Sequence, residues 1–305
     1  MQLPAGIRRQ IEEQADALGF PALQRSAAAL SDAYREGRVA RLTGPERTAA
    51  YLVTRMPATY AAAHAVLREA TKPLGAIGSI LDVGAGTGAA SLAARTYFPD
   101  AAITLLEKDP SFTAAARQWL PDATVLASDI ARVATLPPHD LVIAAYSLGE
   151  FGAQFAAALW KAACVALVLI EPGTPRGFAL LRKVRSDLLA AGARMIAPCP
   201  VETACPLVDP DWCHFAARVE RSSLHRRVKG GELGHEDEKF SYVALAREPV
   251  DLPAARIIRH PRHNPGLIEI ETCTNAGLRS ERISKRDRER FRAARKAAWG
   301  DAGIS

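Results

Sequence analysis

The sequence predicts an α/β protein whose parallel sheet carries a ligand site, and three observations support this prediction. From about residue 79, short apolar runs alternate with helical segments, as in strands joined by crossover helices. The first run, Ser79 to Val83, leads directly into a turn with glycines at alternate positions. Acidic residues stand at or just after the ends of the first three runs. Such a turn favours glycine because a Cβ would block the close approach of a ligand to the backbone.

The expected elements follow the order strand, helix, strand along the chain. Strands are expected at 79–83, 101–107, 123–127, 139–145 and 164–170, with a further strand of the same sheet at 239–245. Helices are expected at about 88–97, 110–119 and 151–162, and again from Phe178 to Ala191. Right-handed crossovers would then place a ligand crevice at the carboxyl ends of the first strands.

The acids beside the glycine turn indicate which ligand the turn receives. Asp82 lies at the end of the first strand, Glu107 closes the second and Asp129 follows the third. S-adenosylmethionine carries an ammonium, a sulfonium and a ribose but no phosphate, so an acid beside the turn suits it and would repel a pyrophosphate. Glu107 would bind the ribose, and Asp129 would bind the adenine amino group. The alternatives are a nicotinamide- or nucleotide-binding domain and a glycine turn without a ligand.

This spacing of glycines and acids resembles the class I S-adenosylmethionine methyltransferases. The resemblance implies a Rossmann-like sheet that binds S-adenosylmethionine through one set of residues. These are Asp82, Gly84, Gly86, Gly88, Glu107 and Asp129.

The turn after the fourth strand, Tyr146 to Glu150, would face the methyl acceptor in such a fold. Many methyltransferases that act on exocyclic amines carry an Asn/Asp-Pro-Pro-aromatic turn there, and this chain lacks it. Enzymes that act on pyrimidine C5 need a cysteine nucleophile, and the turn holds none. Cys164, in the apolar run of the fifth strand, is interpreted as a buried structural thiol. No catalytic residue is therefore identified from the sequence.

The whole chain divides into three regions by composition and pattern. With 305 residues, 49% of them apolar, it can bury a full core. Residues 1–72 are expected to form a helical region, in which the second helix ends at Gly37. A methyltransferase-like domain with a cysteine-rich insertion at 198–230 is expected at 73–248. A β-rich module with a basic tail is expected at 249–305.

Location and assembly are inferred from what the sequence lacks. Met1 to Arg9 contain no long apolar leader, and no apolar run approaches the ~18 residues of a membrane span. We therefore expect a soluble, cytoplasmic monomer without membrane contact. Five cysteines in a reducing compartment are not expected to form disulfides.

Four of the cysteines instead have the character of metal ligands. Cys199, Cys205 and Cys213 lie within fifteen residues, and Cys273 would supply a fourth thiolate from the far end of the chain. The spacings differ from the Cys-x₂-Cys knuckles of structural zinc sites. Irregular ligation by four thiolates favours an iron–sulfur cluster, with zinc and no metal as alternatives. His214 is an alternative ligand in place of one cysteine, but a role in packing or RNA contact is favoured for it.

Two basic segments indicate a polyanionic partner. The formal net charge is +6 and the sequence pI is about 9.2. From Arg279 to Lys296, nine basic residues stand against three acidic ones, which is typical of either a solvated amphipathic helix or an RNA-binding surface. The acidic run Glu236 to Glu238 is interpreted as a solvated loop. The candidate RNA contacts are Arg218, Arg221, Arg226, Arg227, Arg286 and Arg290.

Several motifs together resemble one family, the methyltransferase-like assembly factors of the mitochondrial small ribosomal subunit and their bacterial relatives. The resemblance rests on Asp82 to Gly88, the cysteine set, Glu236 to Tyr242 and Ala293 to Asp301. It implies a [4Fe–4S] cluster on the four cysteines and action on the small subunit during ribosome maturation.

The leading hypothesis is therefore an S-adenosylmethionine-fold protein that binds small-subunit ribosomal RNA, is clamped by an iron–sulfur cluster, and acts as an assembly factor, a methyltransferase or both. The first alternative is a non-catalytic RNA-binding assembly factor with a degenerate cofactor site. The second is a small-molecule methyltransferase with a structural zinc.

Overall fold

A computed structural model of the chain describes residues 1–35 and 44–304. Gly37, the expected end of the second helix, lies outside these residues. The chain forms two compact units, each assembled from three segments. Unit 1 contains Met1–Leu67, Gly78–Ala134 and Ala217–Glu238, and unit 2 contains Arg68–Ile77, Thr135–Ala216 and Lys239–Ser305. The domain boundaries expected from composition stay a prediction.

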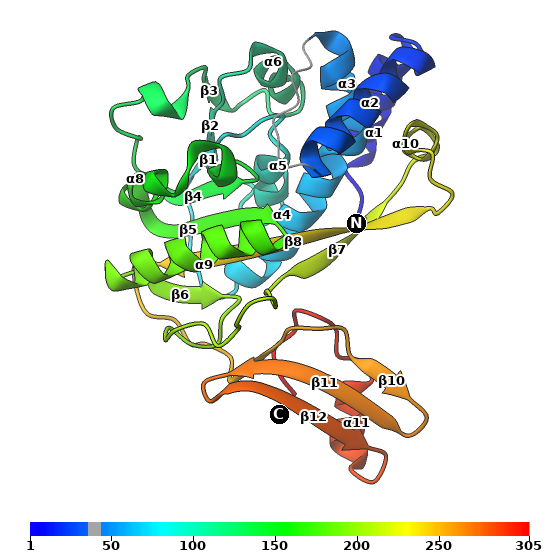
Figure 1. Cartoon of the computed structure of the whole chain (residues 1–305). Coiled ribbons are helices and arrows are strands. Elements are labelled where there is room, and N and C mark those ends of the chain that lie inside the picture. Colours follow the sequence, from blue (N-terminus) through cyan, green and yellow to red (C-terminus); the bar gives the residue numbers. More distant parts are fainter. Residues whose placement is uncertain (36–43, 305) are drawn as a thin grey trace. The chain divides into compact units, whose positions relative to one another are not determined.

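The N-terminal region is helical, as predicted. Its helices are α1 (Ala5–Asp16), α2 (Phe20–Arg35), α3 (Pro45–Thr54) and α4 (Met56–Ala70). Within unit 1, α1, α2 and α3 pack together, and α10 (Ser223–Lys229) packs on α2 and α3 (Figure 1). The buried residues of α1, Ile11 and Ala15, are four apart and therefore share one helix face. Within the part of the chain that the structure describes, no helix has the length and apolarity that crossing a bilayer requires.

Unit 1 also contains the strands that carry the glycine turn. These are β1 (Ser79–Val83), β2 (Ala102–Leu106) and β3 (Thr124–Leu126), which are parallel and lie in the order β3-β2-β1. The register pairs Val83 with Leu106 and Leu106 with Leu126. The three carboxyl ends are therefore level, and the residues that follow them lie at one edge of the sheet. Helices α5 (Ala89–Arg95) and α6 (Pro110–Trp119) follow β1 and β2.

Unit 2 contains a mixed set of strands in the order β4-β5-β8-β6. β4 (His139–Ala145) and β5 (Ala163–Pro172) are parallel, whereas β8 (His235–Ala246) is antiparallel to both β5 and β6 (Arg194–Ala197). Helices α8 (Ala156–Ala162) and α9 (Pro175–Ala190) pack on β5 (Figure 1). The chain thus has the predicted α/β, Rossmann-like methyltransferase fold, with antiparallel strands in unit 2.

The helix expected at 151–162 is divided in the structure. A short α7 (Leu148–Phe151) and a 3₁₀ turn at Ala153–Phe155 precede α8. Gly152 separates them with a φ of 97°, a left-handed conformation that a continuous helix cannot contain. Strand β6 was missed because four residues followed closely by prolines give too short a pattern.

The C-terminal module is a small sheet covered by one helix. It comprises β9 (Ala255–Ile257), β10 (Arg262–Asn264), β11 (Leu267–Thr274), β12 (Gly277–Ser284) and α11 (Arg288–Ala294). The order is β10-β11-β12 (Figure 1), and β9 also pairs with β11. Residues alternate along β11, so Ile268 and Ile270 face a core that Ile283 and Ala294 complete. The β-rich character expected of this module is confirmed, but the first part of the expected basic tail is strand β12.

Two expectations about polar residues were wrong. Glu236 to Glu238 do not form a solvated loop, because β8 begins at His235. Glu238 is buried and lies 3.2 Å from the Arg55 guanidinium, while Glu236 accepts from Arg221 and, at 2.8 Å, from Lys229. These cations allow Glu238 to be buried and Glu236 to be half-buried in a strand.

Cys164, expected to be buried, is exposed. The register between β4 and β5 shifts between His139 and Leu141, whose partners are Ala163 and Ala166. Cys164 lies in this irregular stretch at the start of β5, where the side-chain alternation of a regular strand does not apply.

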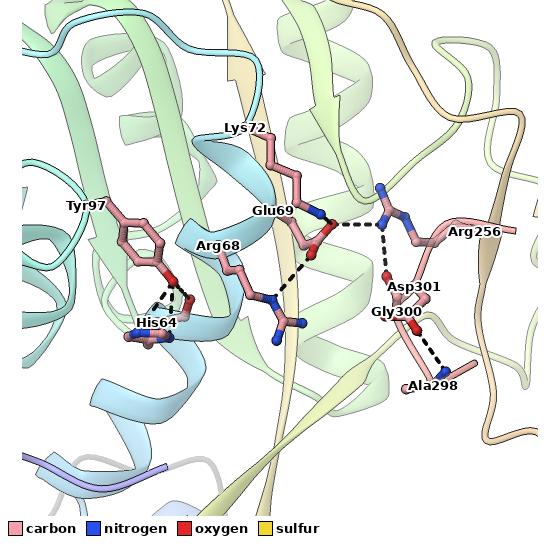
Figure 2. Close-up of polar contacts among 9 residues, drawn as sticks. All are labelled: His64, Arg68, Glu69, Lys72, Tyr97, Arg256, Ala298, Gly300 and Asp301. Carbon is pink, nitrogen blue, oxygen red and sulfur yellow. Dashed lines mark hydrogen bonds and ion pairs between the residues drawn. The ribbon is translucent and has the colours of Figure 1, made fainter. Parts of the chain in front are cut away.

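A buried ion pair holds part of unit 2 together (Figure 2). Arg256 on β9 is 4% exposed and donates to the carbonyls of Pro198 at 2.9 Å and Gly300 at 2.8 Å. It also lies 3.3 Å from Glu69 at the end of α4. Burial raises the pKa of Glu69, but Lys72, Arg256 and Arg68 outweigh it and the net pKa is lowered. Separately, within unit 1, Tyr97 donates to the His64 carbonyl at 3.0 Å (Figure 2).

Candidate cofactor site and cysteine pocket

The turn after β1 requires glycine for conformational and steric reasons. Gly84, Gly86 and Gly88 have φ angles of 69°, 55° and 78°. The amides of Gly84 and Ala85 donate to the Leu106 carbonyl on β2 at 2.8 and 3.2 Å, which fixes the turn at the sheet edge. A Cβ on Gly88 would come within 2.9 Å of the Leu120 side chain. The predicted strand–turn–helix is therefore present.

Asp82 is a buried acid without a basic partner in hydrogen-bond reach among the contacts that the structure describes. It is 1% exposed and accepts from the Ser91 amide at 3.2 Å and the Ser91 hydroxyl at 2.7 Å. Burial raises the pKa of Asp82 to about 6, although the bonds from Ser91 lower it. Burial therefore disfavours the ionised form of Asp82, and a cationic ligand beside the carboxylate would favour it.

Glu107 joins the glycine turn to the segment after β2. One of its carboxylate oxygens accepts from the Gly86 amide at 2.8 Å, and the other accepts from the Asp109 amide at 2.8 Å. Asp82, Glu107 and the three glycines are thus brought together as expected. Asp129 lies at the same sheet edge, where it accepts from the Ala131 amide at 3.0 Å and from Lys108 at 3.4 Å. The Ala131 bond, more than Lys108, lowers the pKa of Asp129.

Helix α3 contributes residues to this site that sequence analysis missed. The Tyr51 hydroxyl lies 3.8 Å from the position of a Cβ on Gly86. Arg47 forms an ion pair with Asp109, and its guanidinium lies 4.5 Å from the centre of the Phe112 ring. No motif links α3 to the glycine turn, since more than thirty residues separate them in the sequence.

The turn expected to face a methyl acceptor contains a strained residue, Tyr146, and contacts a buried acid on β5, Glu171. Tyr146 has a φ of 58°, which is uncommon for a residue with a side chain, and its amide donates to the Ile170 carbonyl at 2.7 Å. Glu171, which sequence analysis did not single out, is 3% exposed and accepts from the Gly149 amide at 3.2 Å. Burial raises the pKa of Glu171 to about 7 against the bonds from the turn amides.

The four cysteines singled out as ligands line one pocket within unit 2. Cys199, Cys205, Cys213 and Cys273 surround a cavity of about 50 Å³, together with Arg185 and Arg256. Arg185 is 3% exposed and donates to the carbonyls of Val201 and Thr203, at 2.7 and 2.9 Å, in the loop between the first two cysteines. Its Nε is buried and has no hydrogen-bond partner among the described residues.

Burial and mutual repulsion disfavour thiolates in this pocket unless a cation is present. Burial raises the pKa of Cys213 well above its usual value, and the other three cysteines raise it further. The pKa of Cys273 is raised to about 11 by burial and by Cys199 and Cys205. Across the described residues, however, no group of three or more His, Cys, Asp or Glu side chains is arranged to hold a metal ion. His214 stacks on Trp212, with ring centres 5.1 Å apart, and packs edge-on against Trp299.

The six candidate RNA contacts fall into both units. In unit 1, Arg221 pairs with Glu236 and its side chain is only 14% exposed, so it has a structural role. Arg218 pairs with Asp237 at 3.0 Å but is exposed, as is Arg226. Arg227 is exposed and lies 4.7 Å above the Phe20 ring.

In unit 2, exposed basic residues of α11 and of the turn that follows it form a stripe, the α11 stripe. Arg286 is exposed, whereas Arg290 is half-buried and pairs with Glu281. Arg288 and Arg292, four residues apart, are exposed on one side of α11, and Lys296 is exposed in the turn that follows the helix. Phe291 and Ala294 pack against the module core.

The glycine turn, its acids and the sheet define a protein of the Rossmann-like methyltransferase class. The model of the family "Mitochondrial small ribosomal subunit Rsm22" matches residues 45–303. The chain therefore belongs to this family.

Two curated relatives show the extent of the similarity. The Rsm22-cox11 tandem protein 2, mitochondrial, of Schizosaccharomyces pombe is 25% identical over 89% of this chain and 45% of its own length. The human ribosome assembly protein METTL17, mitochondrial, is 25% identical over 82% of this chain and 61% of its own length. The chain thus spans about half the length of the curated relatives it matches.

Solved structures with similar folds include two methyltransferases. The plantazolicin methyltransferase BpumL in complex with SAH has a TM-score of 0.46 and 11% identity, covering 80% of this chain and all of that one. The precorrin-6y C5,15-methyltransferase from Geobacter metallireducens GS-15 has a TM-score of 0.40 and 18% identity, covering 60% and 86%.

The expected cytoplasmic location was wrong. The matched family and both relatives are named as mitochondrial proteins, which conflicts with that location. The expectation relied on the missing apolar leader. Mitochondrial targeting instead uses amphipathic, arginine-rich segments, which a search for apolar runs does not detect.

Proposed function

We propose that this chain is a ribosome assembly factor that binds S-adenosylmethionine in unit 1 and the RNA of the small ribosomal subunit through exposed basic side chains. The observation that carries the cofactor part is the arrangement of Asp82 and Glu107 on the glycine turn. Asp82 would interact with the ammonium, Glu107 with the ribose and Asp129 with the adenine amino group. Gly84, Gly86 and Gly88 would allow the cofactor to approach the backbone.

The ribosomal part of the proposal is supported by family membership and by charge. The human relative is named as a ribosome assembly protein. The net charge of +6 and the exposed stripe on α11 fit a phosphate backbone, which attracts arginine and lysine irrespective of base sequence. Arg218, Arg226, Arg227 and Arg286 remain candidate contacts because they are exposed. The ion pairs of Arg221 and Arg290 leave these two residues less available.

Methylation of ribosomal RNA is one form of this proposal, and a non-catalytic assembly factor is the other. In the first form, methyl transfer would rely mainly on holding the acceptor in line with the cofactor's methyl group. The second form is favoured by the acceptor turn, which lacks a recognised acceptor motif and whose Gly149 amide donates to Glu171, the buried acid on β5. Sequencing of methylated sites in ribosomal RNA from a deletion strain would separate the two forms.

The variant Asp82→Asn tests the cofactor site. Because the wild-type carboxylate is buried beside the glycine turn, its loss should weaken S-adenosylmethionine binding by roughly 1–3 kcal/mol in calorimetry.

The pKa of Asp82 in the folded chain is about 6, above its usual value of 3.8, so its contribution to stability is present below pH ~4 and is lost as the pH rises through 6. The asparagine variant should therefore be more stable than wild type at pH 8, by up to about 3 kcal/mol, and similar at pH 4.

This stability measurement serves as the folding control for the affinity measurement. A variant that is folded at pH 8 and binds S-adenosylmethionine as tightly as wild type would remove Asp82 from the site. A wild-type chain that does not bind the cofactor at all would contradict the cofactor part of the proposal.

We further propose that the cysteine pocket holds an iron–sulfur cluster on Cys199, Cys205, Cys213 and Cys273, with zinc as the alternative metal. Four thiols around one cavity are the donor set that such clusters use. A cluster with four thiolates is negatively charged overall, and the buried Arg185 would offset part of that charge. The proposal rests on this chemistry and not on ligand geometry, because the described residues form no group that could hold a metal ion.

Metal analysis of protein purified without oxygen tests this site. Wild-type protein should be brown and contain iron, whereas Cys213→Ser should lose both colour and iron because one of four ligands is gone. The matched control is Cys164→Ser, since Cys164 is exposed and does not line the pocket. Stoichiometric zinc without iron in the wild type, or full iron retention in Cys213→Ser, would contradict the assignment.

A further inference from the structure

Helix α3 contacts both elements of the proposed cofactor site within unit 1. Tyr51 lies over the glycine turn, with its hydroxyl 3.8 Å from the Cβ position of Gly86. One helical turn earlier, Arg47 forms an ion pair with Asp109, the residue that caps α6. The Phe112 ring contacts both side chains: its centre lies 4.8 Å from that of Tyr51 and 4.5 Å from the Arg47 guanidinium. Helix α3 therefore contacts the site at two places, the glycine turn after β1 and the segment that follows β2.

These contacts continue to Glu107 through hydrogen bonds. Asp109 accepts from Arg47 with one oxygen and from the Ser111 amide, at 2.9 Å, with the other. The Asp109 amide in turn donates to Glu107 at 2.8 Å, and the second Glu107 oxygen accepts from Gly86. The position of the Glu107 carboxylate is therefore fixed from two sides. Arg47 pairs with Asp109, the residue whose amide provides one of these bonds.

Arg47 is well placed for this task because it is enclosed. Its side chain is 19% exposed and that of Asp109 is 22% exposed, so the ion pair is screened by water less than a surface pair is. The Nε of Arg47 is also buried and has no hydrogen-bond partner within the described part of the chain, so the guanidinium is enclosed although not all of its donors are satisfied.

We propose that Arg47 and Tyr51 are positioning residues of the cofactor site, through which the N-terminal helices determine the affinity for the adenosine half of S-adenosylmethionine. Arg47 acts by holding Asp109 and thereby Glu107, and Tyr51 acts by covering the glycine turn. This inference rests on the proposed cofactor function. It assigns no chemical step to either residue.

The test is calorimetric titration of two ligands into the full chain and its variants. S-adenosylmethionine contains both the ribose and the ammonium, whereas methylthioadenosine contains the ribose and lacks the ammonium. Arg47→Met should raise the dissociation constants of both ligands about tenfold, because Glu107 acts on the ribose. Tyr51→Leu should also weaken both. Asp82→Asn should weaken only S-adenosylmethionine, since the ammonium is its expected partner.

A double-mutant cycle separates positioning from a general structural effect. If Arg47 acts through Glu107, Arg47→Met should change the affinity little in a Glu107→Ala background. The control is Arg95→Met, which removes the Arg95–Asp122 ion pair of unit 1, 2.7 Å long and distant in sequence from α3. This variant should leave both affinities unchanged.

The failure of the inference is distinguishable from failure of the proposed function. If the wild type binds neither ligand, both are overturned. If the wild type binds and Arg47→Met and Tyr51→Leu bind equally well, only the inference is overturned. Additive losses in Arg47→Met and Glu107→Ala would also overturn it, because they would show that Arg47 acts independently of Glu107.

Discussion

Replacing Arg256 with methionine is expected to lower the free energy of unfolding by about 3–5 kcal/mol. Arg256 is 4% exposed and satisfies the carbonyls of Pro198 and Gly300 while pairing with Glu69. Methionine fills a similar volume but leaves both carbonyls without this donor, and unsatisfied buried groups are costly. Glu69 retains Lys72 at 2.8 Å, so the carbonyls account for much of the loss. Urea denaturation of the variant and wild type measures the effect.

The control is Arg262→Met, which removes an exposed ion pair of the same residue types. Arg262 is 68% exposed and pairs with Glu271 at 2.7 Å, so its loss should cost less than about 1 kcal/mol. Comparable losses in the two variants would contradict the role given to Arg256. A large loss only in Arg256→Met would identify this residue as the link between β9, the Pro198 loop and the C-terminal segment of unit 2.

The parts of the fold that follow strong local patterns were predicted correctly. The turn after Val83 could be predicted because three alternate glycines indicate left-handed φ angles, which the structure contains. The strands on either side of it could be predicted because their apolar runs have the length of buried strands. Strand β12 lacks such a pattern, because Ile283 is its one buried apolar residue. Its register with β11 is set by a turn and by side-chain pairs across the hairpin, which the sequence alone does not reveal.

The candidate site likewise contains residues that the sequence predicts and residues that depend on how the elements pack. Asp82, Glu107 and Asp129 were identified because they stand at strand ends, and level carboxyl ends bring them to one edge. Arg47 and Tyr51 were missed because their relation to the glycine turn depends on how α3 packs. Cys164 and Glu236 to Glu238 were misjudged for a related reason. A register shift at the start of β5 exposes Cys164. Cations from other elements allow Glu238 to be buried and Glu236 to be half-buried in β8.

The stripe on α11 is expected to be the strongest contributor to RNA binding. Arg288 and Arg292 are exposed on one side of the helix and Lys296 is exposed in the turn that follows it, and the structure gives these three residues no ion pair within its described residues. Replacing all three with glutamine should weaken binding to small-subunit ribosomal RNA by about 10- to 100-fold at physiological salt, because up to three phosphate contacts are lost. Glutamine keeps the helix propensity, so α11 should still form.

The matched control neutralises exposed arginines of the same module that are already paired. This control is the double variant Arg262→Gln and Arg282→Gln. In the wild type, Arg262 is 68% exposed and pairs with Glu271, and Arg282 is 71% exposed and pairs with Glu269. Because these acids already compensate the arginines, the control should weaken RNA binding much less than the α11 variant does.

The most direct test of the proposed role is the affinity for small-subunit ribosomal RNA across a salt series, measured for wild type, the α11 variant and the control. The wild type should show a steep fall of affinity with salt. The α11 variant should bind more weakly at every salt concentration, with the slope of log affinity against log salt reduced by about 2. Equal affinities and equal slopes for the wild type and the α11 variant would show that α11 is not the RNA surface. A wild type that does not bind this RNA at any salt concentration would contradict the proposed function itself.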